Sequence, residues 1–188
     1  TALGIDVALD GPATHDLGLF GLGADGRLIA DEWMIFYNQP TSPGGAATLS
    51  PRSDGGSLTI DLAAVPPEVD RLVLTAAVDG DATMAALRSG TVTISAAGAE
   101  VARHRTSGAD FGAERAVMLL ELYRKDGWRL TVVGQGFEGG LAALFSSPAQ
   151  RELLEHIGGL MSLLEGHGDV TMDRAGADQI PNAVRFGQ

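Results

Sequence analysis

The chain has 188 residues, no cysteine, and a formal net charge of −11 from 24 acidic and 13 basic residues. This charge repels nucleic-acid phosphate and anionic lipid, and the absence of cysteine excludes disulfides and thiolate metal sites. With 45% hydrophobic residues the chain can bury one sizeable core. It has neither a signal-peptide pattern nor an apolar run of the roughly 18 to 20 residues that a membrane span requires. We therefore expect a soluble, cytoplasmic protein that binds no nucleic acid.

The first third of the sequence predicts short strands joined by turns. Apolar runs at 3–9 and 17–22 are separated by the turn-rich DGPATHD. The turn residues Ala24-Asp25-Gly26 predict a hairpin that leads into further strands at 27–29 and 34–38. Residues 39–57 are dense in Pro, Gly, Ser and Thr and contain few large apolar side chains. We expect a long surface loop there.

The middle of the sequence continues with strands. Alternating apolar and polar residues predict strands at 57–62 and 71–78, and a hairpin of 91–94 with 101–105 around Ala97-Gly98. The strongest signal is a pair of apolar runs at 117–123 and 129–133, because Asp126-Gly127 between them supplies the positive-φ positions of a short hairpin loop. Strands at such regular spacing predict a mainly β domain over residues 1–145, with two antiparallel sheets packed as a sandwich.

Two stretches resemble the TerD-type tellurium-resistance and stress proteins. ELYRKDGWRLTVVGQGFEGGLAAL at 121–144 is similar to the C-terminal signature of that family. GLGADGRLIADEWMIFYNQPTSPGG at 21–45 is similar to its hairpin and the run that follows, with matches at Ile35, Phe36, Tyr37, Asn38, Ser42, Pro43 and Gly45. The resemblance implies the same sandwich and a non-enzymatic binding module of a bacterial stress response, acting with protein partners. Sequences of this type usually begin with an additional strand, so it also implies an unpaired sheet edge beside the first strand, open to self-association.

The resemblance further implies calcium held by oxygen ligands on loops of the sandwich. The family's acidic D-x-D-x-S positions fall on Thr14, Asp16 and Gly18, and its second acidic loop retains only Asp54. The candidate ligands, which we expect at one end of the sandwich, are Asp6, Asp16, Asn38, Asp54 and Asp79. Because calcium affinity follows the number of charged ligands, binding should be weak, with a dissociation constant on the order of 0.1 mM or weaker.

From Ser147 onward the pattern predicts a helical segment, 146–188. Ser147 is a suitable N-cap, Pro148 suits the first helical position, and apolar residues then recur at helical spacing to 164, so we expect a helix from about 148 to 164. The run LMSLLEGHGDVTMD resembles the C-terminal part of bacterial zincin-like metallohydrolases and implies a metal ligand at Glu165. The His-Glu-x-x-His motif that holds zinc does not occur in the sequence, so we expect neither zinc nor an enzyme. The alternative function is an accessory or regulatory part of a zincin-like hydrolase fusion.

Overall fold

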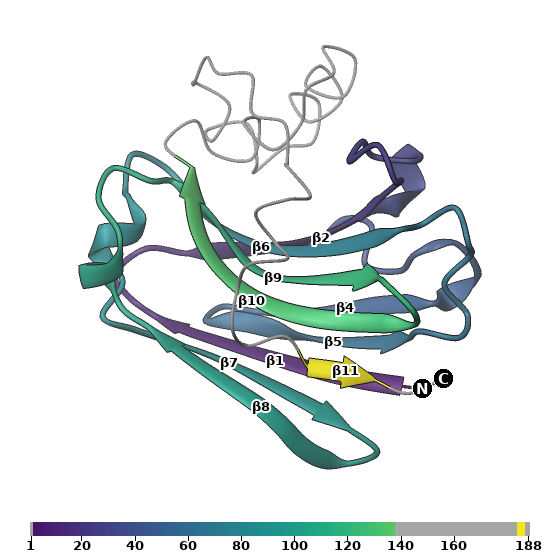
Figure 1. The fold of residues 1–188 in the computed structure, drawn as a ribbon. Helices are drawn as coiled ribbons and strands as arrows, with labels where there is room; N and C mark the ends of the chain where they lie inside the picture. Colours follow the sequence, from purple (N-terminus) through teal and green to yellow (C-terminus); the bar gives the residue numbers. More distant parts are fainter. Residues whose placement is uncertain (1, 138–183, 187–188) are drawn as a thin grey trace.

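The computed structural model describes residues 2–137 and 184–186. These residues fold into two antiparallel sheets that pack face to face (Figure 1). The five-stranded sheet has the order β4-β5-β1-β7-β8, and the six-stranded sheet has the order β11-β10-β9-β6-β2-β3. All neighbouring strands pair antiparallel. The predicted mainly β fold is therefore confirmed.

The strands of each sheet come from several parts of the chain. The five-stranded sheet contains β1 (Ala2–Asp10), β4 (Ala47–Arg52), β5 (Gly55–Asp61), β7 (Ser89–Ala96) and β8 (Ala99–Thr106). The six-stranded sheet contains β2 (His15–Leu22), β3 (Met34–Ile35), β6 (Arg71–Val78), β9 (Ala116–Arg124), β10 (Trp128–Phe137) and β11 (Val184–Phe186). Short 3-10 helices lie in the connections at Asp31–Trp33, Pro43–Gly45, Met84–Ala86 and Gly108–Asp110.

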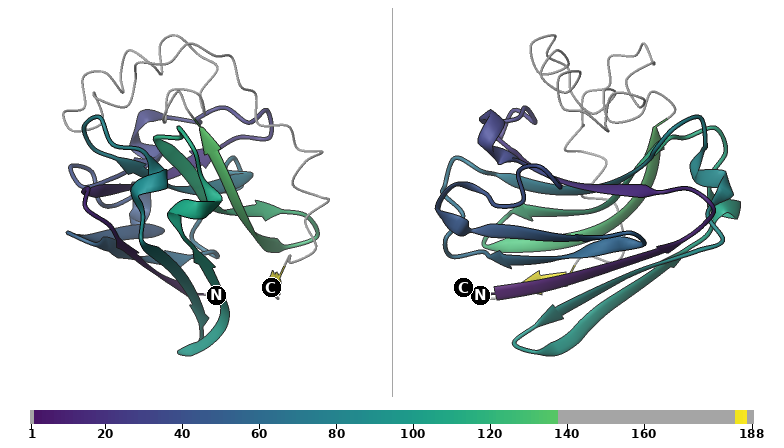
Figure 2. Two further views of the ribbon diagram at one scale, coloured as in Figure 1. Left: turned by 90° about the vertical axis from the view of Figure 1, so that its left-hand side faces the viewer. Right: turned by 180° about the vertical axis from the view of Figure 1, so that it is seen from behind.

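Figure 2 shows the two sheets as layers, and the buried apolar side chains of the core lie between them. Along β1, residues 3, 5, 7 and 9 are buried while residues 2, 6 and 10 are exposed, which is the period of a strand with one face on a core and one in water. The indole N–H of Trp128 in β10 donates a 3.2 Å hydrogen bond to the carbonyl of Leu62, just after β5. This bond links the two sheets across the core.

The hairpin turns predicted at Ala97-Gly98 and Asp126-Gly127 use the positive-φ residues that the sequence supplies. Ala97 and Gly98 have φ of 51° and 79°, and Asp126 and Gly127 have φ of 52° and 102°. The predicted strands at 3–9, 17–22, 57–62 and 71–78 are confirmed as β1, β2, β5 and β6. The strand predicted at 27–29 is wrong, because Leu28 makes only an isolated bridge to Leu22. The strand predicted at 34–38 ends at Ile35.

The long loop predicted at 39–57 is also wrong. Residues 47–52 form β4, which pairs with β5 from Ala47 opposite Ile60 to Arg52 opposite Gly55. Proline in this segment is compatible with a strand because β4 lies at the edge of the sheet, where an N–H is dispensable. Leu49 is buried between exposed polar neighbours, and this single large apolar side chain anchors the strand.

The unpaired edge expected beside the first strand is not present there. β1 lies in the middle of its sheet, where Ala2–Ala8 pair with β5 and Leu3–Asp10 pair with β7. The sequence did not reveal this position because β5 and β7 are distant in the chain. The edges of this sheet are β4 and β8.

The predicted helix at 148–164, the residues Glu165 and His167, and the domain boundary near 145 lie outside the described residues. The described part of the C-terminal segment, Val184–Phe186, is a strand that pairs with Trp128–Leu130 of β10. These three residues therefore belong to the six-stranded sheet rather than to a helix. No helix among the described residues is long and apolar enough to cross a lipid bilayer.

Gly55 provides a test of how the β4–β5 hairpin packs on β1. Its φ is 131°, and a Cβ at this position would lie 2.2 Å from the carbonyl oxygen of Val7. Gly55→Ala should therefore lower the free energy of unfolding by about 3 kcal/mol or more, through backbone strain and overpacking. Gly44 is the matched control, because its φ is 67° but a Cβ there would meet no atom within 4 Å, so Gly44→Ala should cost about 1 kcal/mol. Urea unfolding measures both, and equal costs would contradict this packing.

Candidate functional site

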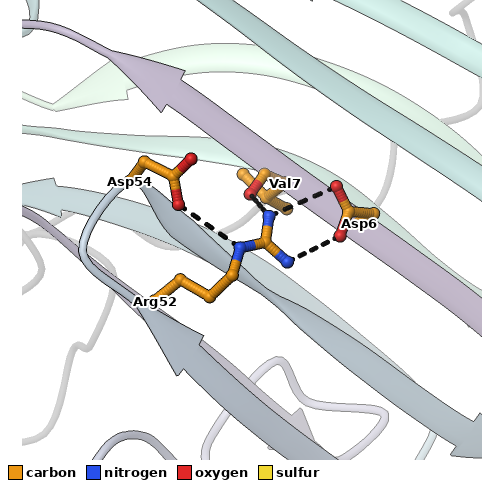
Figure 3. Close-up of polar contacts among 4 residues, drawn as sticks. All are labelled: Asp6, Val7, Arg52 and Asp54. Atoms are coloured by element: carbon orange, nitrogen blue, oxygen red, sulfur yellow. Dashed lines mark hydrogen bonds and ion pairs between the residues drawn. The ribbon is translucent and has the colours of Figure 1, made fainter.

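A cluster of three charged side chains lies on the exposed face of the five-stranded sheet (Figure 3). Asp6 projects from β1, Arg52 ends β4, and Asp54 lies in the two-residue turn before β5. The turn is fixed against β1 because the N–H of Leu9 donates a 2.6 Å hydrogen bond to the carbonyl of Asp54. We call Asp6, Arg52 and Asp54 the Arg52 cluster.

The guanidinium of Arg52 binds all the other members of the cluster. Its Nη1 donates to Asp6 Oδ2 at 2.8 Å, and its Nη2 donates to Asp6 Oδ1 at 3.3 Å and to the Val7 carbonyl at 3.1 Å. Its Nε donates to Asp54 Oδ1 at 3.3 Å. Hydrogen bonds to Asp6, and secondarily to Asp54, raise the pKa of Arg52 above its ordinary value. The side chains are 40 to 61% exposed, so the ion pairs contribute at most about 1 kcal/mol to folding.

Asp16 and Asp79 form a second acidic pair at one end of the six-stranded sheet. Asp16 lies in β2, and Asp79 follows β6 and donates its N–H to the carbonyl of Thr14 at 3.1 Å. Asp16 is partly buried, and this burial, followed by the charge of Asp79, raises the pKa of the Asp16 carboxyl. A bound cation would relieve both effects, because it would compensate the charge of the desolvated carboxylate.

The predicted calcium ligands are thus placed in two pairs and one separate residue. Asp6 and Asp54 share Arg52, Asp16 lies near Asp79, and Asn38 is exposed in the turn closed by a bridge between Phe36 and Gln39. Within residues 2–137 and 184–186, no group of three His, Cys, Asp or Glu side chains is positioned to hold a metal ion. Asp6 and Asp54 do not fit a calcium ion while the guanidinium takes their oxygens. Calcium binding by these residues stays a prediction.

Sequence reasoning missed the arginines that bind these carboxylates. Arg52 lies in the segment predicted as a loop and is 46 residues from Asp6. Arg88 binds Asp10 through two hydrogen bonds of 2.6 and 2.9 Å, and this contact lowers the pKa of Asp10. The only local signal was the proximity of Arg52 to Asp54, because the pairing of β1 with its neighbours is not visible in the sequence.

A separate ion pair is buried in the six-stranded sheet. Arg71 in β6 and Glu121 in β9 approach to 3.1 Å and are 3% and 2% exposed. Such a pair is costly to break, because removing one partner leaves a buried charge uncompensated. Its burial among apolar side chains indicates a structural role rather than a binding site.

Comparisons with known proteins agree with the geometry of the two sheets. The profile of the TerD domain matches residues 2–147. Tellurium resistance protein TerD of Serratia marcescens is 35% identical over 148 residues, covering 69% of this chain and 74% of that protein. Tellurium resistance protein TerA of an Alcaligenes species is 31% identical over 114 residues, covering 59% of this chain, which spans only 33% of that longer protein. A crystal structure of a homologue of the telluride resistance protein TerD from Streptomyces coelicolor has a TM-score of 0.59 at 17% identity, covering 79% of this chain and 93% of that one, and shares the fold.

The raised pKa of Asp16 predicts a pH dependence of stability. In the unfolded chain this carboxyl titrates near its ordinary pKa of about 3.9, whereas the folded protein holds the proton to higher pH. Between the two values the folded state binds more protons, so the contribution of Asp16 to the free energy of unfolding falls as pH rises. Wild type should therefore lose stability relative to Asp16→Asn between pH 4 and pH 7. Urea unfolding of both proteins measures the difference, and a constant difference would contradict the burial of this carboxylate.

Proposed function

The chain belongs to the TerD family, and we propose that it is a non-enzymatic binding module of a bacterial, cytoplasmic stress response of the tellurium-resistance type. The proposal rests on the exposed face and edge of the five-stranded sheet, where charged groups are arranged for contact rather than for proton transfer. Asp10 illustrates this, because a carboxyl whose pKa is lowered by an arginine is a weak general base.

The observation that carries the proposal is the open edge strand β8. It has eight residues, and among the described residues no hydrogen bond reaches its outer backbone edge. Alternate backbone N–H and C=O groups of such an edge are available to a partner strand. In Figure 1, β8 lies at the free margin of the sheet, beyond β7.

The other three edge strands are covered or short, and β11 has only three residues. The outer edge of β4 is covered by residues 40–42, because Leu49 donates to the carbonyl of Pro40 at 2.7 Å and Ser42 donates to that of Ala47 at 2.9 Å. The Oγ of Ser42 also accepts from the N–H of Ala47 at 2.8 Å. β3 has only two residues. A partner that adds a strand is therefore best accommodated on β8.

The charge of β8 indicates the chemistry of the partner. Arg103, His104 and Arg105 follow one another in this strand, in a chain of net charge −11. An extended protein segment with acidic side chains would complement them. Two copies of β8 would complement each other poorly in the antiparallel pairing centred on His104, because it places Arg103 opposite Arg105 and like charges directly opposite are destabilising. We therefore propose a different protein as the partner, with self-association as the competing outcome.

Growth in the presence of tellurite tests this function. Deleting the gene in its host should lower the tellurite concentration at which growth stops, and the wild-type gene should restore it. Arg103→Glu combined with Arg105→Glu should restore much less, because the edge would then repel an acidic strand. The control is Arg27→Glu combined with Lys125→Glu, which changes the charge equally at exposed positions outside β8 and should restore fully.

Three other results of this experiment would contradict parts of the proposal. Unchanged tellurite tolerance after deletion would contradict the proposed function. Full restoration by the β8 double variant would exclude β8 as the contact surface. Dimers of the wild-type chain that the same variant converts to monomers, measured by light scattering, would favour self-association.

We also propose weak calcium binding centred on Asp16 and Asp79, supported by the raised pKa of Asp16. Two carboxylates leave most of the coordination to carbonyl oxygens and water, so the dissociation constant should be on the order of 0.1 mM or weaker. In calorimetric titration, Asp16→Asn should weaken binding further, whereas Asp126→Asn in the β9–β10 turn should not. Sub-micromolar binding, or binding indifferent to Asp16, would show that the site lies elsewhere.

The alternative function, an accessory part of a zincin-like hydrolase fusion, concerns residues 146–188. Apart from β11 these residues lie outside the described part of the chain, and the TerD profile ends at residue 147. A His-Glu-x-x-His motif elsewhere in the intact reading frame would favour this alternative.

A further inference from the structure

Four oxygen atoms converge on the guanidinium of Arg52 (Figure 3). They are both carboxylate oxygens of Asp6, Oδ1 of Asp54 and the carbonyl oxygen of Val7, at 2.8 to 3.3 Å from the arginine nitrogens. A carboxylate that offers both oxygens, a second carboxylate and a backbone carbonyl are the oxygen types that calcium takes in proteins. In this protein the guanidinium of Arg52 lies among these oxygens.

The backbone positions the residues that carry these oxygens without help from Arg52. Asp6 and Val7 are consecutive residues of β1, which is paired on both sides. The turn that carries Asp54 is tied to β1 by the Leu9 hydrogen bond of 2.6 Å and by the close approach of Gly55 to the Val7 carbonyl. Removing the guanidinium would therefore leave Asp6, Val7 and Asp54 as neighbours and change the formal charge of the cluster from −1 to −2.

We propose that Arg52 is a tethered cation that takes the place of a divalent ion between Asp6 and Asp54. One of the two carboxylate charges is then compensated at any calcium concentration, and a cation requirement appears only when the guanidinium is removed. This inference goes beyond the proposed function and does not depend on it. It also concerns a different part of the molecule from Asp16 and Asp79.

The Asp10–Arg88 pair offers a matched control on the same sheet. Arg88 also makes two hydrogen bonds to one carboxylate, and the two side chains are 64% and 60% exposed. Among the described residues, Arg88 forms an ion pair with Asp10 alone, whereas Arg52 contacts two carboxylates. Removing Arg88 thus removes an equivalent ion pair without leaving two carboxylates together.

The experiment compares Arg52→Ala, Arg52→Gln, Arg52→Lys and Arg88→Ala with the unchanged protein. All are made in the Asp16→Asn background, so that the calcium binding proposed for Asp16 contributes little. Calcium chloride is added at constant ionic strength, and the amide resonances of Asp6, Val7 and Gly55 are followed by NMR. Thermal unfolding with calcium and with a chelator gives a second readout.

Arg52→Ala and Arg52→Gln should bind calcium at this cluster with a dissociation constant on the order of 1 mM, roughly tenfold tighter than the protein that retains Arg52. Calcium should also raise their unfolding temperature. Arg52→Lys, which keeps a cation, and Arg88→Ala should behave like the unchanged protein. The inference would be overturned if neither Arg52→Ala nor Arg52→Gln gained calcium affinity, or if Arg52→Lys or Arg88→Ala gained as much. Calcium binding that is equally tight at these amides with Arg52 present would also overturn it. Arg52→Gln, which keeps most of the side-chain length, decides the matter if Arg52→Ala does not fold.

Discussion

The close approach of Gly55 to the carbonyl of Val7 is the constraint on which the exposed face of the five-stranded sheet depends. A side chain at position 55 has no room, because its Cβ would lie 2.2 Å from that oxygen. With glycine at position 55, the turn of the β4–β5 hairpin lies close beside β1. The carbonyl of Asp54 then accepts a hydrogen bond from the N–H of Leu9 at 2.6 Å. Arg52, at the end of β4, then reaches both Asp6 and Asp54 of the turn. One backbone contact thus determines which charged groups meet.

Arginine–carboxylate ion pairs lie in different environments in the two sheets and contribute differently to stability. In the six-stranded sheet every residue of β6 is buried, and the Arg71–Glu121 pair is 3% and 2% exposed, so breaking it costs about 3 to 5 kcal/mol. On the exposed face of the five-stranded sheet, pairs such as Asp10–Arg88 are screened by water and contribute little to folding. Charges on that face can therefore change without loss of the fold. This freedom is expected of a surface whose role is contact with other molecules.

Local signals in the sequence predicted much of the fold but little of the site. Alternation predicted β5 and β6, and the positive-φ turn residues Ala97-Gly98 and Asp126-Gly127 predicted two hairpins, because these features are encoded within a few neighbouring residues. β4 was missed because an edge strand tolerates proline and needs only one large apolar side chain, Leu49. Pairing between distant strands has no local signal. For that reason the five acidic and amide candidates were known from the sequence, whereas the arginine that binds Asp6 and Asp54 was not.

The arginines of the five-stranded sheet and its connections differ in their acidic partners. Arg52 and Arg88 are each held by carboxylates, and Arg103 binds Glu100 at 2.6 Å. Arg105 has no acidic partner among the described residues. It lies on β8, the long strand whose outer edge receives no hydrogen bond from the described residues. If β8 receives an acidic strand, as we propose, this cation beside open backbone groups would attract the strand and orient it along β8. Arg105 should then carry more of the attraction than Arg103.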